Sequence, residues 1–513
     1  MAMVRPRITE YIKIASKRCN GRHFSSSSAL RSNASATLPI ARLLDHGPKN
    51  SSNVAVNGYV RSVRNQKRRS FVAIGDGSTL ESLQALLSPE QAQSLSTGTA
   101  VRLTGEWKES PNPQAQSHEL HVSKVDVLGV SDAAKYPMQK KYQSLEYLRT
   151  MPHLRTRIPF NTTLLRLRSD CISEITSFLS QEGFTQTHTP IITSSDCEGA
   201  GEVFHVASPH KGPVSETDDG TFFRSTKYLT VSSQLHLEAL AQSVGNTWTL
   251  SPTFRAEKSD TKRHLSEFYM LELEMSFVEE LSSVMDVVEK LVQRVTKPLL
   301  SSRVGKEILS SRALDGHDDP DAITSETIRH RWERILADRW PRITYTEAIN
   351  MLTESTADFE HKPEWGAGLS IEHEQYIANT LDSPVFVTHY PSSIKPFYML
   401  ASTKDSSPGE TVDCFDLLLP NAGELVGGSM REHRLESLIS SMQSHGMLPS
   451  GPVESLTDDQ LGALKWYIDL RRWGSVPHGG FGLGFDRLLG YLAGVPNIRE
   501  INTFPRWVGR CEC

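Results

Sequence analysis

The chain has 513 residues, and its composition of 38% hydrophobic and 22% charged residues is typical of a soluble globular protein. This length exceeds what one ordinary core holds, so two or three domains of about 100 to 200 residues each are expected. The net charge of −5 excludes a protein that coats nucleic acid by bulk positive charge, and leaves room only for a local basic patch. No run of about 18 apolar residues is present, so we expect no membrane partner. The six cysteines lack paired spacing other than that of Cys511 and Cys513, which favours free thiols over a disulfide framework or a zinc site.

Residues 1–44 differ in composition from the rest of the chain. They contain eight basic residues against one acid, Glu10, and a run of four serines at 25–28. Arg-rich, Ser-rich and acid-poor segments are typical of organellar transit peptides, and the stretch RHFSSSS resembles a matrix-processing site with cleavage near Phe24. Residues 1–44 are therefore predicted to be a transit peptide and disordered leader that directs the protein to the mitochondrial matrix. The alternative is a basic arm that is merely disordered.

Five short alternating stretches follow, and residues 45–130 are predicted to form one domain. The stretches are VAVNGYVRSV, FVAIGDGS, LESLQALL, AVRLTGEW and ELHVSKVDVLGV. Turn residues separate them, which predicts a small closed barrel of the OB-fold type, whose typical ligand is single-stranded nucleic acid. Phe71 is a candidate base-stacking residue, and the basic turn with Lys67 and Arg68 would contact phosphates. The alternatives are a core role for Phe71 and a solvated turn.

A polar linker is expected at 131–160, followed by a larger domain at 161–513. Its first element is a helix with apolar residues at helical spacing, which Gly183 ends. The next stretch, FTQTHTPIITSS, looks like a strand, but Pro190 restricts it to an edge or an interface. Residues 280–380 predict two or three helices, and the charged stretch ALDGHDDPDAI is expected to be a solvated loop.

One predicted hairpin carries two acids that require an explanation. Its first strand ends at FRAE, residues 254–257, and SEFYMLELEMSF, residues 266–277, returns as the second strand. Period two places four side chains of the second strand on one face: Phe268, Met270, Glu272 and Glu274. The hairpin should bring Arg255 beside this face. Two carboxylates on a central strand are costly unless a cation or a hydrogen-bond donor meets them.

Three further stretches contain candidate chemistry. In CFDLLLPNAGELVGGSMRE, Asp416 and Glu424 lie on either side of a turn and could share a divalent cation through oxygen. GSVPHGGFGLGFDRLLGYLAG predicts a Gly-rich strand that runs into a helix with Arg487 near its start. It is not a dinucleotide fingerprint, because Arg487 stands where a third glycine is needed. In YLTVSSQLHLEAL, Ser232 and Ser233 end a strand and can cap the following helix.

In this order, TPIIT, FRAE with HLSEF, and GFGLGFDRL resemble the three motifs of class II aminoacyl-tRNA synthetases. The barrel resembles the anticodon-binding domain of the aspartate, asparagine and lysine branch. EGAGEVF, YLTVSSQLHLEAL, GELVGGSMRE and WGSVPHGGFGLGFDR resemble the asparagine enzymes, and the leader resembles that of a mitochondrial form. Over about residues 54–513, this implies an α+β protein with an N-terminal OB-fold β-barrel and a catalytic domain built on an antiparallel sheet flanked by helices. It also implies a homodimer that meets at Pro190 and the preceding helix.

The resemblance implies ATP-dependent ligation of asparagine to the 3′ end of tRNA(Asn) through an asparaginyl-adenylate, for mitochondrial translation, with ATP and Mg²⁺ as cofactors. Arg255 and Arg487 are the implied catalytic residues, on the α- and γ-phosphates. The implied ATP-binding residues are Arg255, Glu257, His264, Phe268, Glu424 and Arg487. Asp416 and Glu424 would hold the metal, and adenine would stack on Phe268. His264 could instead be a turn histidine that contacts only water.

The implied amino-acid-binding residues are Glu198, Ser232, Gln234, Glu272 and Arg431. Glu198 and Gln234 would meet the ammonium group, and Arg431 the side-chain oxygen. Aspartate enzymes carry a lysine where this chain has Leu237, and an aspartate where it has Glu272. The longer carboxylate suits an amide NH₂ donor and repels a substrate carboxylate, which favours asparagine over aspartate.

Three rival hypotheses follow from the same residues. The rival enzyme is an aspartyl-tRNA synthetase, including a non-discriminating form that charges both tRNAs. An ammonia-dependent asparagine synthetase shares the catalytic fold but lacks the barrel predicted at 45–130. A non-catalytic nucleic-acid-binding paralogue would typically lose the motif arginines, whereas Arg255 and Arg487 are both present.

Overall fold

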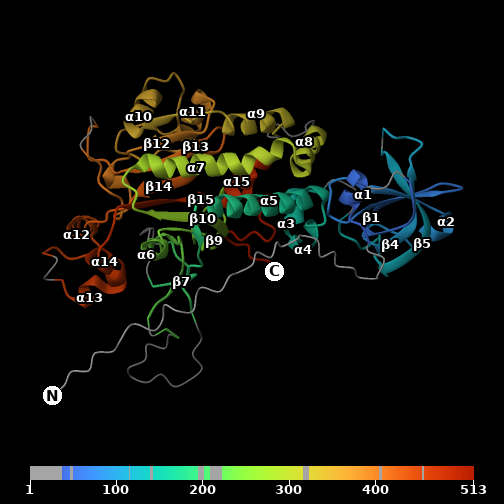
Figure 1. Ribbon diagram of the computed structural model, residues 1–513, viewed down its shortest axis with the longest axis horizontal. Helices are drawn as coiled ribbons and strands as arrows, with labels where there is room; N and C mark the ends of the chain where they lie inside the picture. Colours follow the sequence, from blue (N-terminus) through green and yellow to red (C-terminus); the bar gives the residue numbers. More distant parts are fainter. Residues whose placement is uncertain are drawn as a thin grey trace, which may run out of the picture.

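The computed structural model describes residues 37–46, 50–114, 116–138, 143–194, 202–207, 222–223, 225–315, 323–403, 407–452 and 456–513. A small β-barrel lies at one end of the molecule, beside a larger body built on one sheet (Figure 1). Among the helices of these residues, none is long and apolar enough to cross a bilayer. Residues 1–36 of the predicted leader, Glu198 and most of the predicted loop at 313–323 lie outside the described residues.

The barrel is closed by five strands in the order β1-β2-β3-β5-β4. The strands are β1 (Ser51–Asn65), β2 (Ser70–Gly75), β3 (Leu83–Leu87), β4 (Ala100–Glu109) and β5 (His118–Gly129), and the short helix α2 (Pro89–Ala92) follows β3. Only the β3–β5 pair is parallel among them. Alternating side chains such as Val56, Ile74 and Leu103 fill the interior. The predicted OB-fold barrel is confirmed.

Helix α1 (Ile40–His46) packs onto this barrel. Ile40 and Leu43 are buried in the barrel core, and the backbone N–H of Ile40 donates to Asp76 Oδ2 at 2.8 Å. The barrel therefore includes residues that the composition of the sequence assigned to the leader. A removable leader would have to end before Leu38, because loss of α1 would expose the core that it covers.

The body contains an eight-stranded sheet in the order β11-β12-β13-β14-β15-β10-β9-β6. Along the sheet the strands are β11 (Arg342–Thr344), β12 (Val385–Thr388), β13 (Cys414–Leu419), β14 (Gly423–Met430), β15 (His478–Gly484), β10 (Glu267–Ser276), β9 (Asn246–Phe254) and β6 (Thr185–Gln186). The sheet is antiparallel from β12 to β9, as predicted, and a parallel pair stands at each edge. The stretch around Pro190 forms two short strands instead of one, β6 in this sheet and β7 (Ile192–Thr193), which pairs with β8 (Tyr228–Leu229). Pro190 lies exposed between them and cannot donate to a ladder.

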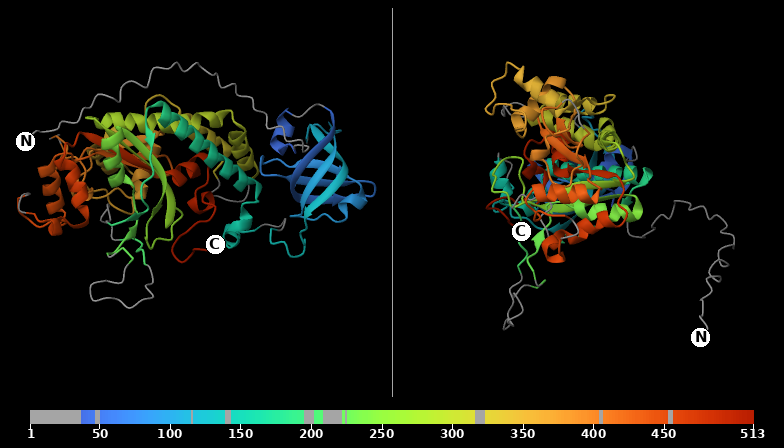
Figure 2. Two further views of the ribbon diagram at one scale, coloured as in Figure 1. Left: turned by 60° about the horizontal axis from the view of Figure 1, so that its bottom comes forward. Right: turned by 90° about the vertical axis from the view of Figure 1, so that its left-hand side faces the viewer.

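One face of the sheet is covered by long helices (Figure 2). They are α5 (Pro159–Gln181), α7 (Leu281–Thr296) and α15 (Phe485–Ala493), with the 3₁₀ turn Lys297–Leu300 after α7. Helices α8 (Arg303–Asp315) and α9 (Ser325–Ile335) pack against these helices. Leu167 and Ile175 of α5 pack with Leu271 and Leu273 of β10 in one continuous core. The chain leaves α5 through Gly183, whose φ of +81° suits glycine. The opposite face of the central strands is thereby left for ligands.

Smaller elements frame that opposite face. They are α6 (Gln234–Val244), α10 (Tyr345–Thr353), α11 (Ile371–Leu381), α12 (Leu435–Ser444), α13 (Asp458–Leu461), α14 (Lys465–Arg472) and the 3₁₀ turns Ser392–Ile394 and Gly462–Leu464. Between barrel and body, α3 (Leu145–Arg149) and α4 (Pro152–Arg155) dock against α16 (Ile498–Ile501). Arg149 and Arg155 both pair with Glu500, at 2.6 and 3.0 Å. The later part of the predicted linker is thus bound to the body.

Candidate active site

The β9–β10 hairpin forms the centre of the site. Leu271 and Leu273 of β10 point into the core, while Glu272 and Glu274 face the opposite side, as the two-residue period predicts. Within the sheet, β10 pairs with the Gly-rich strand β15, and Glu274 lies opposite Gly480 in this pair. A Cβ at Gly480 would stand 2.1 Å from Glu274 Oε2, so glycine is required for the acid to lie there.

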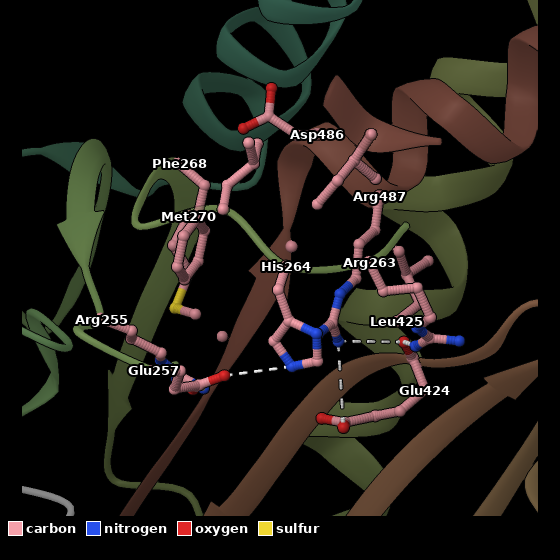
Figure 3. A pocket seen from close by; sticks show the side chains of 14 residues that line it. Arg255, Glu257, Arg263, His264, Phe268, Met270, Glu424, Leu425, Asp486 and Arg487 are labelled. Atoms are coloured by element: carbon pink, nitrogen blue, oxygen red, sulfur yellow. Dashed lines mark hydrogen bonds and ion pairs between the residues drawn. The ribbon is translucent and has the colours of Figure 1, made fainter. Parts of the chain in front are cut away.

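A first cavity lies between this hairpin and the start of α15 (Figure 3). Its polar lining comes from Arg255, Glu257, Arg263, His264, Glu424, Asp486 and Arg487, and its apolar lining includes Phe268 and Met270. The guanidinium of Arg255 lies 5.7 Å from the centre of the Phe268 ring. Arg487 Nη1 donates to the carbonyl oxygen of Glu424 at 3.3 Å and is 4.0 Å from its carboxylate. The cavity therefore combines an aromatic face with cations that are only loosely paired.

Arg263 is a lining residue that the motif comparison missed. Its Nη2 donates to the carbonyl oxygen of Glu424 at 3.2 Å, and burial and then the nearby charge of Arg487 lower its pKa. Next to it, His264 Nε2 contacts Glu257 Oε2 at 3.1 Å, so His264 does not contact water alone. Burial lowers the pKa of His264, which favours the neutral ring. The basic turn KRH was the signal in the sequence for Arg263.

A second cavity of about 360 Å³ adjoins the first. Its lining includes Ser232, Gln234, Leu237, Arg255, Met270, Glu272, Glu274, Lys395, Tyr398, Asp416, Glu424 and Arg431. Arg255, Met270, Glu424 and Gly482 line both cavities. Two ligands bound in the two cavities would therefore meet at these four residues.

Glu272 is buried and hydrogen-bonded before any ligand binds. The backbone N–H of Ser233 donates to both of its oxygens, at 2.9 and 3.0 Å, and the hydroxyl of Ser232 donates at 2.5 Å. These donors stand at the N-terminus of α6, where the helix dipole favours a negative charge. Of the two predicted capping serines, only Ser232 contacts the helix through its side chain, by accepting from the N–H of Gln234 at 3.1 Å. The Ser233 hydroxyl instead bonds to Thr189.

Glu274 holds Arg431 through two parallel hydrogen bonds of 3.0 and 3.1 Å. Arg431 Nη1 also donates to the hydroxyl of Ser429 at 2.7 Å. Burial alone would lower the pKa of Arg431, but the facing carboxylate outweighs it and raises the pKa above its usual range. The second acid of the strand therefore orients a charged arginine at the cavity wall.

Glu238 holds Gln234 in a comparable way, and sequence reasoning missed it. This fully buried carboxylate accepts from Gln234 Nε2 at 3.1 Å, from Arg471 at 2.7 Å and from Tyr467 at 2.8 Å. Burial alone would raise the pKa of Glu238, but Arg471 and the nearby His478 outweigh it and lower the pKa. An ionised carboxylate only accepts, so Gln234 must present its NH₂ to Glu238. The amide oxygen of Gln234 is then the atom available to a ligand.

Asp416 and Glu424 stand on neighbouring strands on either side of Gly427. The position of a Cβ at Gly427 is 3.5 Å from Asp416 Oδ1 and 3.5 Å from Glu424 Oε1. Lys395 Nζ donates to Asp416 Oδ2 at 2.8 Å. No group of three or more His, Cys, Asp or Glu side chains arranged for a metal ion occurs in the described ranges. Two carboxylates nevertheless fit Mg²⁺, which binds one or two carboxylates together with substrate phosphates.

Comparison with known proteins adds to this geometry. The family described as tRNA synthetases class II (D, K and N) matches residues 144–508, and the OB-fold nucleic acid binding domain matches residues 54–128. An asparagine–tRNA ligase of Desulfotalea psychrophila is 41% identical over 467 residues, which are 90% of this chain and 96% of that protein. The chain belongs to the class II asparagine–tRNA ligase family.

Other members of the class II asparagine–tRNA ligase family agree with this placement. The mitochondrial asparagine–tRNA ligase of Saccharomyces cerevisiae is 40% identical over 474 residues, which are 88% of this chain and 92% of that one. The crystal structure of asparaginyl-tRNA synthetase from Pyrococcus horikoshii complexed with asparaginyl-adenylate is 28% identical with a TM-score of 0.77. The matched region covers 93% of this chain and 99% of the Pyrococcus horikoshii chain.

The structure brings together most of the residues that the synthetase motifs implied. Arg255, Glu257, His264, Phe268, Glu424 and Arg487 surround the first cavity, and Ser232, Gln234, Glu272, Asp416, Glu424 and Arg431 the second. On the barrel, Phe71 is half-exposed on β2 with the guanidinium of Arg64 4.8 Å from its ring centre. Lys67 and Arg68 are exposed on the adjoining turn. Phe71 is therefore not a buried core residue of the synthetase barrel.

Proposed function

We propose that this chain ligates asparagine to the 3′ end of tRNA(Asn) in two steps, through an asparaginyl-adenylate made from ATP. The observation that carries the proposal is the junction of two cavities at Arg255, Met270, Glu424 and Gly482. One cavity offers an aromatic face and cations suited to a nucleotide, and the other offers fixed polar groups suited to a small amide. Joined cavities allow a carboxylate in one to reach the α-phosphate in the other.

In the first step, adenine stacks on Phe268, Arg255 meets the α-phosphate and Arg487 the γ-phosphate. The substrate carboxylate attacks the α-phosphorus and pyrophosphate leaves. Positioned cations stabilise the charge that develops on the phosphate oxygens. Glu257 holds His264 beside the nucleotide, with Arg263 as a further cation on the phosphate side.

Asp416 and Glu424 would hold Mg²⁺ on the phosphates. Bound there, the ion would neutralise the charge of the phosphates. Lys395, which pairs with Asp416, would stay as a second positive charge at the same wall. Burial alone would lower the pKa of Lys395, but Asp416 outweighs it and raises the pKa, so the amine is charged at neutral pH.

Asparagine is selected by three side chains of the second cavity and by Glu198, which lies outside the described residues. The oxygen of Gln234 accepts from its ammonium group together with Glu198, and Arg431 donates to its side-chain oxygen. Glu272 accepts from its amide NH₂. An aspartate substrate would place a carboxylate against Glu272, and the buried Leu237 supplies no cation to neutralise it.

The second step joins the asparaginyl group to tRNA. The terminal ribose hydroxyl attacks the carbonyl carbon of the mixed anhydride and AMP leaves, so no side-chain nucleophile is needed. The barrel would bind the anticodon, with Phe71 stacking on a base and Lys67 and Arg68 contacting phosphates. Asparagine, ATP and tRNA(Asn) are thus the proposed substrates.

The proposed location is the mitochondrial matrix. It is supported by the basic, serine-rich leader and by 40% identity to mitochondrial enzymes of Saccharomyces cerevisiae and Schizosaccharomyces pombe. Residues 1–36 fused to a fluorescent protein should accumulate in mitochondria, and a diffuse signal would overturn this assignment.

A homodimer is also proposed, because Ile191 and Ile192 beside Pro190 are exposed apolar residues. Sedimentation equilibrium at twice the chain mass would support it, and the chain mass alone would contradict it.

The decisive experiment is ATP–pyrophosphate exchange with either asparagine or aspartate. We expect exchange with asparagine to exceed that with aspartate by orders of magnitude. Exchange with aspartate alone would favour the aspartyl-tRNA synthetase alternative. Comparable exchange with both would favour the non-discriminating form, and exchange with neither would remove the catalytic proposal.

A further inference from the structure

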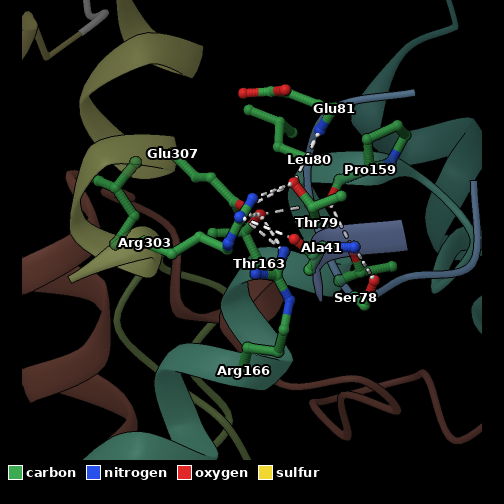
Figure 4. A network of polar contacts seen from close by, with 12 residues as sticks. Ala41, Ser78, Thr79, Leu80, Glu81, Pro159, Thr163, Arg166, Arg303 and Glu307 are labelled. Carbon is green, nitrogen blue, oxygen red and sulfur yellow. Dashed lines mark hydrogen bonds and ion pairs between the residues drawn. The ribbon is translucent and has the colours of Figure 1, made fainter. Parts of the chain in front are cut away.

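The barrel and the body meet at a buried carboxylate, Glu307 of α8 (Figure 4). Its Oε1 accepts from the Thr79 hydroxyl of the barrel at 2.9 Å. Its Oε2 accepts from the Thr163 hydroxyl at 2.9 Å and from Arg166 Nη2 at 2.6 Å, both on α5. One side chain therefore connects three segments that are distant in sequence.

The charge of Glu307 is maintained by these partners. Burial alone would raise its pKa, but hydrogen bonds from Arg166, the backbone N–H of Leu80 and Thr163 outweigh burial and lower the pKa. The carboxylate is therefore ionised at neutral pH and accepts hydrogen bonds without donating any. Because a buried charge that loses its partners is costly, separation of barrel and body is opposed at this point.

Arg303 reinforces the junction from one turn earlier on α8. Its Nη1 donates to the Thr79 hydroxyl at 3.1 Å, and its Nη2 donates to the carbonyl oxygen of Ala41 at 3.1 Å. It also forms an ion pair with Asp45 of α1. From the barrel side, Arg61 Nη1 donates to the carbonyl oxygen of Leu80 at 2.9 Å. The loop between β2 and β3 is thus hydrogen-bonded both by Arg61 of the barrel and by Arg303 and Glu307 of the body.

A tRNA that is read at its anticodon and charged at its 3′ end must contact two separate places on the enzyme. The distance and angle between barrel and active site then decide whether both contacts form at once. None of the α8 side chains that the structure describes lines either cavity of the candidate active site. An effect of α8 on the reaction would therefore act through the barrel, or through α5, whose Arg168 pairs with Asp486 at the first cavity. Only the second route would change exchange as well as charging.

We propose that Glu307 is a positioning residue that sets the barrel against the catalytic body, and thereby supports charging of tRNA but not activation of the amino acid. The inference rests on the proposed function, which it extends to a step in which α8 takes part without touching a substrate. It predicts that the two half-reactions respond differently to the same substitution.

The test compares Glu307→Gln with wild type in ATP–pyrophosphate exchange and in aminoacylation of tRNA. The introduced amide has one acceptor oxygen, so it cannot accept from both Arg166 and the Thr79 hydroxyl, and the negative charge that strengthens the contact across the junction is lost. We expect kcat/KM for tRNA to fall about tenfold or more, and exchange kinetics to stay within about twofold. The matched control is Lys306→Ala, because Lys306 is the exposed neighbour of Glu307 on α8.

A double-mutant cycle with Thr79→Val tests whether the effect runs through the barrel contact. The double variant should charge tRNA no worse than Glu307→Gln alone, because both changes remove the same hydrogen bond. Thr79→Val also provides a milder probe if Glu307→Gln folds poorly. Equal loss of exchange and charging, or unchanged charging, would overturn the proposal. Wild-type protein without exchange activity would instead contradict the proposed function.

Discussion

Two neighbouring cavities on one face of the sheet differ in how tightly their charged side chains are paired. In the second cavity, which we propose binds the amino acid, Glu274 and Arg431 are 0% and 3% exposed and joined by two parallel hydrogen bonds of 3.0 and 3.1 Å. In the first cavity, which we propose binds the nucleotide, the Arg255 side chain is 29% exposed and lies 3.8 Å from Glu257. The first arrangement fixes donors and acceptors before asparagine arrives, which reduces the entropy lost on binding. The second keeps cations available for phosphates that carry their own charge.

Arg431→Leu should have the largest effect, because it removes one partner of a buried ion pair. The remaining Glu274 would be a buried charge without compensation, which costs about 3–5 kcal/mol. We expect a large drop in the thermal midpoint together with loss of asparagine-dependent exchange. Arg294→Ala is the matched control, since that arginine and its partner Glu174 are 44% and 32% exposed, and the change should alter stability by about 1 kcal/mol or less. A similar drop in the thermal midpoint of both variants would refute the expected difference between a buried and an exposed ion pair.

Arg255→Ala should separate activity from stability on the nucleotide side. Loss of a cation that stabilises the transition state costs about 3 kcal/mol, so exchange should fall by roughly 100-fold or more. The thermal midpoint should change by only a few degrees, because this side chain is partly exposed and solvent screens its charge. Retained exchange activity would show that the phosphate chemistry is misassigned.

Glu272→Gln should impair the choice of amino acid. The amide cannot accept from both the Ser233 N–H and the substrate NH₂ as a carboxylate does, so the KM for asparagine should rise about tenfold to 100-fold. The KM for ATP should stay within about twofold. Glu257→Gln in the other cavity should show the reverse pattern in the same exchange assay. A parallel rise in both constants for Glu272→Gln would exclude the proposed role.

Glu238→Gln should have a smaller effect on asparagine binding, together with a loss of stability, because the buried Arg471 loses the carboxylate that pairs with it. A neutral amide at this position lets the amide of Gln234 turn over, so the acceptor for the substrate ammonium is lost part of the time. The KM for asparagine should rise about fivefold to tenfold. Inhibition by succinamate, which is asparagine without its amino group, should be unchanged. An equal change for asparagine and succinamate would mean that Glu238 only supports the fold.

The smallest effect is expected at Glu374, whose Oε2 accepts from the backbone N–H of Glu424 at 2.9 Å. Burial and then the charge of Glu424 raise the pKa of Glu374 to about 7. The folded state therefore binds a proton that the unfolded state has released, and stability falls as the pH rises from about 4.5 to 7. Glu374→Gln should remove this part of the decline in urea unfolding at pH 5 and pH 8. The exposed Glu354→Gln should keep the wild-type profile, and an unchanged profile in Glu374→Gln would contradict the prediction.

Much of the fold was readable from local patterns. The barrel strands, helix α5 and the two faces of β10 follow from periods of 2 and 3.6, because alternation of apolar and polar residues is a property of the chain itself. Helix α1 was missed because its few apolar residues sit in a segment with a leader-like composition. The split at Pro190 depended on which sheet each half joined, which no local signal encodes.

By itself, the sequence determined which residue types stand on each face and, through their motifs, the reaction class and most lining residues. The tertiary structure alone decided how these charges are paired. It assigned Glu272 to the N-terminus of α6, Glu274 to Arg431, Glu238 to Gln234 and Glu307 to the barrel. Most of these pairs join segments that are far apart in the chain. Glu238 and Gln234 are close in sequence, but Arg471, which also donates to Glu238, is far from both. A buried charge is costly unless it is paired, so each of these groups needs a partner. Which partner lies within reach depends on how distant segments pack together, and no single stretch of sequence determines that.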